Sequence, residues 1–438
     1  MAILAPPRRH LIPHPSAGFW PGLHLPGTAP VHAAVAKQLV RAAIRSLPMT
    51  LSLPDGTRWG KGGPELQVTR PEAFFTRLGR DGLIGFGEAW MTAELTADRL
   101  PARDVSGAAL NAATDVLAGA LTVLARRMST LIPVPLQRLR RLWQQAQPRT
   151  EQNTPAGARE NIHRHYDLSN ELFEQFLDET MTYSAAWFEP GENPATELRK
   201  AQLRKIDGIL DLARVGRGSR VLEIGSGWGA LAMRAAAERG ATVTTLTLST
   251  EQKALAEQRI AAAGLADRIE VRLEDYRVHA AGNPGTYDAV VSVEMIEAVG
   301  EEFWPAYFGA VDRLLAEGGR FGLQSITIDH DRMLATRHQY TWVHKYIFPG
   351  GILPSLTAID AVLAGRTRLR VQEGRRLGHS YALTLREWRH RFNDRYQQIR
   401  RLGFDDTFVR MWNFYLAYSE AGFTADYIDD WQLGIGRG

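Results

Sequence analysis

The sequence predicts an α/β protein: a Rossmann-like domain with a mostly parallel sheet and helices on both faces, and a smaller N-terminal α+β domain. Two observations lead to this prediction. From about residue 195, apolar stretches of strand length alternate with stretches of helical length. A glycine-rich turn, GSGWG at 225–229, also follows the first of these strands and precedes a helix. Ligands of such sheets bind at the carboxyl ends of the strands.

Composition limits the classes of protein that the chain can belong to. Its 438 residues are 45% hydrophobic and 23% charged, which is typical of a globular protein with a large core. The chain has no cysteine, which excludes disulfides, thiolate metal sites and a thiol nucleophile, and we expect no metal site. The sequence shows no signal-peptide pattern, and no window approaches about 18 uncharged apolar residues. We therefore expect a cytoplasmic protein that does not span a bilayer.

The N-terminal third divides into three parts. Residues 1–30 are rich in Pro, Gly and His, and poor order is expected there. Residues 31–125 predict a small domain, with a helix at 32–47, strands around the Asp55-Gly56 turn, and a helix–turn–helix at 71–91.

A basic linker is predicted over residues 126–160. Its first part, 126–149, holds six arginines and no acidic residue, interleaved with apolar residues. Two interpretations stay open: a solvated helix followed by a linker, or a surface for anionic lipid headgroups. No base-reading module accompanies the arginines, so no nucleic-acid partner is expected.

The alternating region begins with a helix at 197–215. Strands are then expected at 219–225, 241–249, 269–276, 287–295 and 320–328, with helices at 230–240, 250–264 and 303–319.

The glycine turn identifies the kind of ligand that the sheet would bind. It has no Gly-Lys-Ser/Thr for phosphates, and its spacing is G-x-G-x-G rather than the G-x-G-x-x-G of dinucleotide sites. Glu223 precedes the turn, and an acid suits a cofactor with a cationic end. The run VLEIGSGWG (221–229) is similar to the first motif of S-adenosylmethionine methyltransferases. The alternative is a tight strand-to-helix turn without a ligand.

Longer segments carry a more specific resemblance. Over about residues 155–425 the chain resembles the cyclopropane-fatty-acyl-phospholipid synthase family, which includes the mycolic acid cyclopropane synthases. The matching segments include NIHRHYDLSNELFEQFLDETMTYSAAWF (161–188), EMIEAVG (294–300), HKYIFPGGILPS (344–355), GHSYALTLREW (378–388) and MWNFYLAYSEAGF (411–423). The resemblance implies a class I methyltransferase domain over 161–438 that uses S-adenosylmethionine, with a lipid-binding domain before it.

The same resemblance implies the cofactor residues. Tyr183 and Ser184 match positions that contact the methionine portion, and Asp275 and Tyr276 match the adenosine end. Packing in the core is the alternative for the two tyrosines. The full predicted set is Tyr166, Tyr183, Ser184, Glu223, Gly225, Gly227, Thr247, Gln252, Asp275 and Tyr276.

The catalytic residues depart from the family pattern. The family's base is a bicarbonate held by Cys, Glu, His and Tyr side chains and an Ile backbone amide. Here Ala185 and Gln324 stand at the Cys and His positions, which puts bicarbonate binding in doubt. The predicted catalytic residues are Glu297, Tyr381, Glu160 and Gln324, and Ile326 also matches the family.

Two of these residues have structural alternatives. Glu160 is a candidate carboxylate in place of bicarbonate, and its alternative is a helix-terminal acid. Glu297 is the safer candidate. Its alternative is a capping acid, although the adjoining Glu294 could serve as the cap instead.

The resemblance also implies the substrate and product. The cofactor's methyl group goes to the cis double bond of an oleoyl-type acyl chain in a phospholipid, and the site of deprotonation sets the product. The wording of the motifs is most similar to an actinobacterial branch that makes 10-methylene chains, precursors of 10-methyl-branched fatty acids. A cyclopropane synthase and a catalytically inactive lipid-binding protein are the alternatives.

Four further expectations concern partners and location. We expect an anionic phospholipid surface, a position on the inner face of the membrane, a partner reductase and a homo-oligomer. Residues 343–355 are expected either to cover the acyl channel or to form a packed connector.

Overall fold

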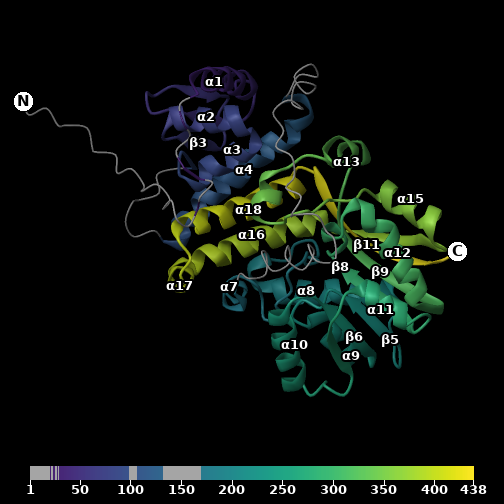
Figure 1. Cartoon of the computed structure of the whole chain (residues 1–438). Helices are drawn as coiled ribbons and strands as arrows, with labels where there is room; N and C mark the ends of the chain where they lie inside the picture. Colours follow the sequence, from purple (N-terminus) through teal and green to yellow (C-terminus); the bar gives the residue numbers. More distant parts are fainter. Residues whose placement is uncertain (1–19, 21–22, 25–26, 28, 98–105, 132–168) are drawn as a thin grey trace, which may run out of the picture. The chain divides into compact units, whose positions relative to one another are not determined.

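The computed structural model describes residues 20, 23–24, 27, 29–97, 106–131 and 169–438 (Figure 1). The chain forms two compact units: 1–143 with 392–418, and 144–391 with 419–438. The sequence assigned 392–418 to the methyltransferase domain, whereas the structure places this segment in the first unit. There Phe414 packs against Phe86, with ring centroids 6.2 Å apart. An apolar helix does not reveal from its sequence alone which core it joins.

The first unit is an α+β arrangement with a four-stranded sheet of order β2-β1-β3-β4. Its elements are α1 (Pro30–Ile44), β1 (Thr50–Ser52), β2 (Arg58–Gly60), β3 (Glu65–Val68), α2 (Pro71–Asp81), α3 (Leu83–Met91), β4 (Leu95–Ala97), α4 (Gly107–Leu131) and α17 (Tyr396–Arg401). The predicted hairpin forms, because β1 and β2 pair antiparallel around the Asp55-Gly56 turn. The predicted helix–turn–helix also forms, and its turn residue Gly82 has φ +56°.

A buried ion-pair cluster anchors the core of the first unit. The Arg77 side chain donates to Glu94 at 2.8 Å and lies 3.6 Å from Glu88. It also donates to the backbone carbonyls of Leu23 and His24 at 3.1 and 2.8 Å. The prediction of poor order over 1–30 is therefore wrong for this part, since Leu23 is buried and hydrogen-bonded to the core.

Helix α4 is long and apolar enough over residues 107–127 to cross a membrane by length and composition. The criterion applied to the sequence was stricter, because it required uncharged apolar residues and this stretch contains Asn111 and Asp115, so the expectation of no membrane span stays a prediction. Within the first unit, however, α4 contacts β3 and β4 and buries Leu110, Leu117 and Leu121. Core helices pass the same test, so this is weak evidence for a membrane span.

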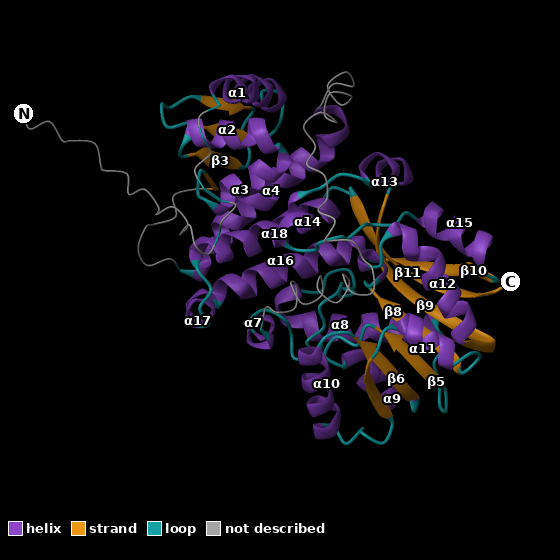
Figure 2. Cartoon of the chain, viewed as in Figure 1, coloured by secondary structure: helices purple, strands orange, loops and turns teal. Residues whose placement is uncertain are grey.

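The second unit contains the predicted alternation of strands and helices (Figure 2). Its elements are α7 (Asn170–Glu174), α8 (Pro194–Leu212), β5 (Arg220–Ile224), α9 (Ala230–Arg239), β6 (Thr242–Thr247), α10 (Thr250–Ala262), β7 (Ile269–Leu273), α11 (Tyr276–Gly282), β8 (Tyr287–Val293), η3 (Ile296–Ala298), η4 (Glu301–Phe303), α12 (Trp304–Leu314), β9 (Leu315–Ile328), α13 (His330–Thr336), α14 (Trp342–Tyr346), α15 (Leu356–Arg366), β10 (Leu369–Arg376), α16 (Gly378–Asp394) and β11 (Ile428–Arg437). Helix α18 (Asp406–Thr424) lies mostly in the first unit. The unit boundary at 391/392 falls within α16, and the one at 418/419 falls within α18.

The sheet of this unit has seven strands in the order β10-β11-β9-β8-β5-β6-β7. Strands β5 to β9 pair in parallel, whereas β11 runs antiparallel to both β9 and β10. The predicted mostly parallel sheet is confirmed. From β5 the chain adds β6 and β7 on one side, and it then adds β8 and β9 on the other side of β5. Ligands of open α/β sheets bind at this switch point, between β5 and β8.

Two apolar layers cover the two faces of this sheet. Successive strand residues point to opposite faces, so Val221 joins a core with helices α8, α9 and α10, and Leu222 joins a core with α11, α12 and α15. Helices therefore lie on both faces, as predicted. Burial of these layers fixes the register of the sheet and holds the strand ends that carry the site.

Candidate active site

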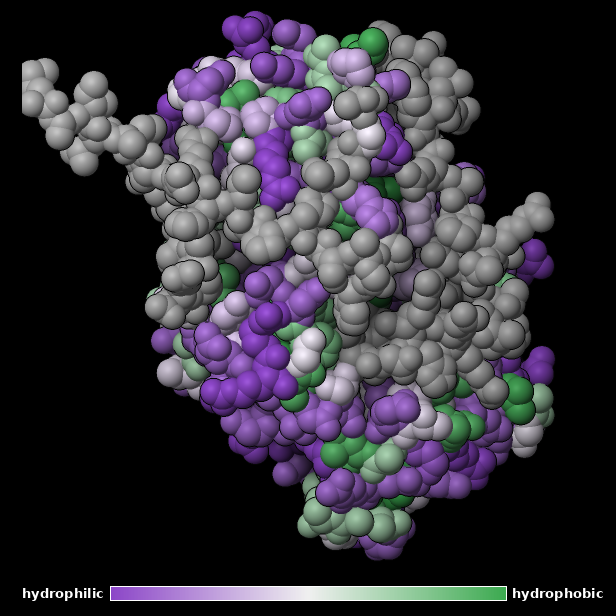
Figure 3. All heavy atoms as spheres, turned by 60° about the vertical axis from the view of Figure 1, so that its left-hand side comes forward, coloured by the Kyte–Doolittle hydropathy of each residue, from purple (hydrophilic) through white to green (hydrophobic). Residues whose placement is uncertain are grey.

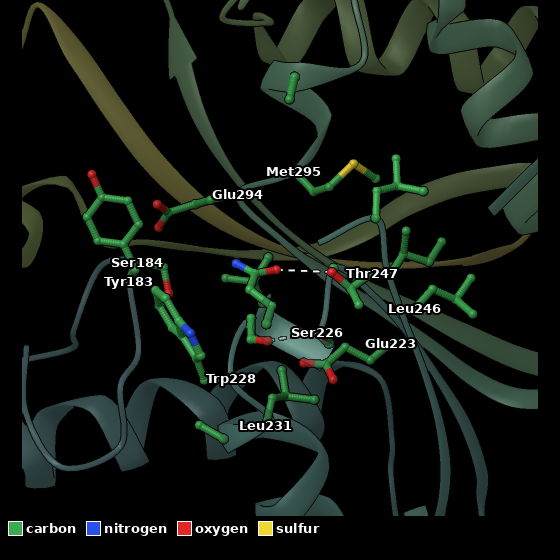
Figure 4. Close-up of a pocket in the computed structure, with 18 of the residues that line it drawn as sticks. Tyr183, Ser184, Glu223, Ser226, Trp228, Leu231, Leu246, Thr247, Glu294 and Met295 are labelled. Carbon is green, nitrogen blue, oxygen red and sulfur yellow. Dashed lines mark hydrogen bonds between the residues drawn. The ribbon is translucent and has the colours of Figure 1, made fainter. Parts of the chain in front are cut away.

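A cavity of about 220 Å³ lies at the carboxyl ends of β5, β6, β7 and β8. Residues after these strands and residues 181–184 line it. Of the predicted cofactor residues, the cavity brings together Tyr183, Ser184, Glu223, Gly225, Gly227, Thr247, Gln252, Asp275 and Tyr276. Figure 4 shows Glu294 and Met295 on one side of the cavity and Glu223 and Ser226 on the other.

The glycine turn forms the floor of the cavity. Gly225, Gly227 and Gly229 have φ values of +96°, +47° and +87°, which favour glycine. The backbone amides of Gly225 and Ser226 both donate to the carbonyl of Leu246, at 3.0 and 2.9 Å. A Cβ at Gly227 would meet no atom within 4 Å, so its backbone conformation rather than crowding requires glycine.

Glu223 lies at the end of β5 and is 4% exposed. Its carboxylate accepts a hydrogen bond from Thr245 Oγ1 on β6, at 2.6 Å. Burial raises the pKa of Glu223 to about 8, and the hydrogen bond from Thr245 and the charge of Lys205 oppose that rise. A cationic ligand in the cavity would favour the ionised carboxylate.

The ends of β6 and β7 add polar groups. Thr247 Oγ1 donates to Gln252 Oε1 at 3.0 Å. Asp275 caps α11 and accepts from the Arg277 backbone amide and Nε, both at 2.8 Å. The ring of Tyr276 packs edge-to-face against Tyr307, with ring centroids 5.4 Å apart. Burial raises the pKa of Tyr276 to about 12.

Tyr183 and Ser184 come from the loop after residue 180. The ring of Tyr183 packs against Trp388 and Phe173, with centroids 5.3 and 5.1 Å apart. Ser184 Oγ accepts a hydrogen bond of 2.6 Å from Lys205 Nζ of α8. Tyr183 thus lines the cavity and also belongs to an aromatic cluster, so it packs as the alternative interpretation expected, and its contact with the cofactor stays a prediction.

Glu294 is the carboxylate at the cavity wall that the sequence analysis missed as a site residue. It directly follows β8 and has φ +49°, which is strained for a residue with a side chain. Its Oε1 accepts from the Ala185 amide and Gln324 Nε2, both at 2.8 Å, and Tyr381 Oη donates to its Oε2 at 2.5 Å. Burial raises the pKa of Glu294, and these donors oppose the rise. Gln324 and Tyr381, predicted as catalytic residues, therefore contact Glu294.

Glu297 occupies a different position. It is not among the residues that line the cavity. Its Oε1 accepts from Ser325 Oγ at 2.8 Å and from the Ile326 amide at 2.6 Å, while its buried Oε2 has no hydrogen-bond partner among the residues that the structure describes. Burial and the charge of Glu294 raise its pKa to about 8. Its predicted catalytic role stays a prediction.

Asp430 and Lys205 complete the buried charge cluster. Asp430, on β11, accepts from Gln324 Nε2 at 2.9 Å, and burial followed by the charges of Glu294 and Glu297 raises its pKa well above the usual range. Lys205 is 1% exposed, and its pKa falls to about 8 because burial outweighs the attraction of the surrounding carboxylates. The site thus gathers more acids than bases.

Three other predictions concern Glu160, Tyr166 and the segment 343–355. Glu160 and Tyr166 lie outside the described residues, so their predicted roles stay predictions. The segment 343–355 is anchored beside the site, because the amide of Ile352 donates to the carbonyl of Glu297 at 2.8 Å and Ile347 is buried. This packing fits the connector interpretation. Among the described residues, no group of three His, Asp or Glu side chains could hold a metal ion.

The fold and the site together define an S-adenosylmethionine-dependent methyltransferase. The residues present fit this cofactor, since the glycine turn, a buried carboxylate and polar side chains from three strand ends converge on one cavity. The comparisons identify the family. The family model described as mycolic acid cyclopropane synthetase matches residues 153–433, and the chain belongs to this family.

Known proteins agree with this assignment. The chain is 48% identical to tuberculostearic acid methyltransferase UfaA1 of Mycobacterium tuberculosis, over 93% of this chain and 92% of that one. It is 30% identical to cyclopropane-fatty-acyl-phospholipid synthase of Escherichia coli K12, over 86% and 89%. The solved structure of cyclopropane synthase MmaA2 from M. tuberculosis has a TM-score of 0.57 at 28% identity, over 63% and 97%. That of cyclopropane synthase CmaA1, complexed with SAH and CTAB, has a TM-score of 0.57 at 30% identity, over 66% and 98%. The chain is thus a methyltransferase that acts on lipids.

Proposed function

We propose that this enzyme methylates the cis double bond of an oleoyl-type chain in a phospholipid and so converts that chain into a 10-methylene acyl chain. The observation that carries the proposal is the cavity at the switch point, which holds the glycine turn and Glu223 on one side and a carboxylate, Glu294, on the other. The 48% identity to a tuberculostearic acid methyltransferase, over nearly the whole chain, favours a methyl branch over a ring.

The chain's own residues would hold the cofactor, which supplies an electrophilic methyl group when bound. We assign Gly225 and Gly227 to close backbone approach and Glu223 to the positively charged end. Thr247 and Gln252 offer hydrogen-bonding groups after β6, and Asp275 and Tyr276 offer a carboxylate and a ring after β7. Tyr183 and Ser184 close the methionine side.

The product depends on the order of events after methyl transfer. An alkene is a weak nucleophile, so the reaction needs close alignment in a site that excludes water. The methylated chain carries a positive charge on the neighbouring carbon. Immediate loss of a proton from the new methyl group would close a cyclopropane ring. If a hydride first shifts from the methyl-bearing carbon, loss of the same proton leaves a methylene group. The timing of deprotonation therefore decides the product, and the expectation that its site does so is corrected.

The first prediction tests the product. Purified protein incubated with labelled S-adenosylmethionine and dioleoyl phospholipid vesicles should transfer label, and proton NMR should show vinylidene signals rather than upfield cyclopropane signals. The two products have equal mass, so mass spectrometry alone does not separate them. Cyclopropane signals would replace the proposal by ring formation. Vesicle binding without any transfer would support the inactive lipid-binding protein.

An outward apolar stripe on α1 supports docking on a membrane. Val31, Val35 and Leu39, spaced four residues apart, are 71%, 54% and 49% exposed, so nothing in the described structure covers them. Helix α1 contains no Asp or Glu, and its two cationic residues, Lys37 and Arg41, are exposed. Elsewhere, hydrophobic residues lie in small groups among hydrophilic ones on the face that Figure 3 shows. Helices that lie on anionic lipid combine an apolar face with cationic and few acidic residues.

The second prediction tests this stripe. The double substitution Val35→Ser, Leu39→Ser should weaken binding to phosphatidylglycerol vesicles by roughly tenfold, because two apolar side chains lose their burial in lipid. Vesicle flotation measures the binding. Leu83→Ser is the matched control, since Leu83 is 48% exposed in the same unit but lies outside α1. Equal binding of the double variant and the control would exclude α1 as the docking surface.

Three expectations remain proposals that nothing above tests. A methylene group must gain two electrons and two protons to become a methyl branch, so a partner reductase would consume the product. We place the enzyme in the cytoplasm, on the inner face of the membrane, and we expect a homo-oligomer.

A further inference from the structure

We propose that Glu294 is a built-in anion, whose carboxylate permanently fills a three-donor cradle and thereby excludes bicarbonate or any other small carboxylate from the site. The occupancy of the cradle follows from contacts alone. Its consequence, that the cavity carries a fixed negative charge toward the methylated chain, rests on the proposed function. Ala185 and Gln324, which stand at the family's Cys and His positions, put bicarbonate binding in doubt. The structure gives a different reason, because the Glu294 carboxylate already accepts from the donors.

The donors come from three separate segments and converge on one carboxylate. The Ala185 amide belongs to the loop after residue 180, Gln324 to β9 and Tyr381 to α16, and each donates to Glu294 within 2.5–2.8 Å. Ala185, Gln324 and Tyr381 are 0%, 0% and 6% exposed, so water does not compete for these bonds. A carboxylate offers about four acceptor positions, and three of them are used here.

The orientation of the Gln324 amide is fixed by its neighbours. Gln432 Nε2 donates to the backbone carbonyl of Lys205 at 2.9 Å, which identifies that atom as the nitrogen of its own amide. It also donates to Gln324 Oε1 at 3.0 Å. Gln324 must therefore present its Nε2 to the carboxylates of Glu294 and Asp430. The cradle is consequently built to hold an anion, whether or not Glu294 is present.

The backbone of Glu294 shows which substitution would empty the cradle. Its φ of +49° is a conformation that glycine adopts without strain. Glu294→Gly therefore removes the carboxylate and also relieves the backbone. The space left behind is lined by donors for a planar monoanion with two or three oxygens, the class to which formate and bicarbonate belong.

The test measures anion binding in the absence of cofactor and lipid. The Glu294→Gly variant should show a saturable rise of its thermal unfolding midpoint with sodium formate or bicarbonate at constant ionic strength. The ¹³C NMR signal of labelled bicarbonate should also broaden when the variant is added. The wild type should show neither effect. Asp426→Gly is the matched control, because Asp426 also has positive φ, at +52°, and its side chain is 77% exposed. It relieves the same kind of strain without opening a cavity.

Measurements on the wild type keep the proposal falsifiable should the glycine variant fail to fold. Wild-type turnover should be equal in bicarbonate-depleted and bicarbonate-supplemented buffer. Saturable bicarbonate binding by the wild type, a bicarbonate requirement for turnover, or a folded glycine variant that binds no anion would each overturn the proposal. None of these outcomes depends on which lipid product forms, so a failure here is distinguishable from a failure of the proposed function.

Discussion

Glu223→Gln should weaken the binding of S-adenosylmethionine by roughly 10- to 100-fold, the size expected for loss of a charge-assisted hydrogen bond in a buried site. The carboxylate is 4% exposed and lines the cavity beside the glycine turn. Glutamine keeps the shape and can still accept from Thr245, which holds the carboxylate at 2.6 Å. The variant should therefore fold normally and lose only the negative charge.

The pH dependence gives this prediction a second measurement. Burial raises the pKa of Glu223 to about 8, so in the free enzyme the group is largely protonated at neutral pH. A cationic ligand stabilises the ionised form and lowers this pKa in the complex, so binding releases a proton. Wild-type affinity should consequently rise from about pH 6 to about pH 8 and level off above. The contribution of Glu223 to this slope should disappear in Glu223→Gln.

Isothermal titration calorimetry without lipid measures both effects. Glu270→Gln is a suitable control, because it makes the same chemical change at an exposed position on β7. The control should retain wild-type affinity and pH dependence. An unaltered pH profile in Glu223→Gln would show that the carboxylate does not face the bound cofactor.

The parts of the fold that follow simple periodicity could be predicted from sequence. Strands β5, β6 and β8 are apolar runs between helices, and the glycine turn marks the end of β5. Strands β10 and β11, at the edge of the sheet next to β9, were not predicted, because their sequences contain charged residues and glycines that obscure the strand pattern. Strand β9 also begins at Leu315 rather than at residue 320, because Leu315 pairs with Tyr287.

The missed strands explain the missed part of the site. Asp430 and Gln432 lie on β11 and reach the site only through pairing with β9, where Gln432 faces Gln324. Glu294 lies at the carboxyl end of the strand predicted over 287–295, and that position was the available signal. A capping acid has the same signature, however, and only the converging donors from distant segments distinguish the two roles.

Lys205→Met should destabilise the protein by about 3–5 kcal/mol near pH 7, the cost expected when one partner of a buried charge cluster is removed. At this pH Lys205, whose pKa is about 8, is still largely charged. Lys205 is 1% exposed and donates to Ser184 at 2.6 Å. Its charge attracts Glu294, Asp430, Asp178 and Glu223, so the unpaired carboxylates would have to remain charged in the interior or take up protons.

The loss should depend on pH in a direction that the carboxyl pKa values fix. Burial raises the pKa of Glu294, Asp430 and Glu223, so the folded state binds more protons than the unfolded state over the range above the ordinary pKa of these groups. Stability therefore falls as pH rises through this range, and removing the lysine raises these pKa values further and steepens the fall. Near pH 5 Glu223, whose pKa is about 8, is largely protonated in the folded state, and the variant should lose less.

Urea unfolding at pH 5 and pH 7, where Lys205 is largely charged in the wild type, measures the difference. Lys200→Met is the matched control on the same helix, because Lys200 is 62% exposed and its removal should leave the free energy of unfolding nearly unchanged. An equal loss for Lys205→Met at both pH values would mean that lost packing, rather than lost charge, dominates. A variant as stable as the control would mean that the carboxyl groups beside the cavity are neutral without the lysine. The buried cation would then have no part in keeping Glu294 ionised at the cavity wall.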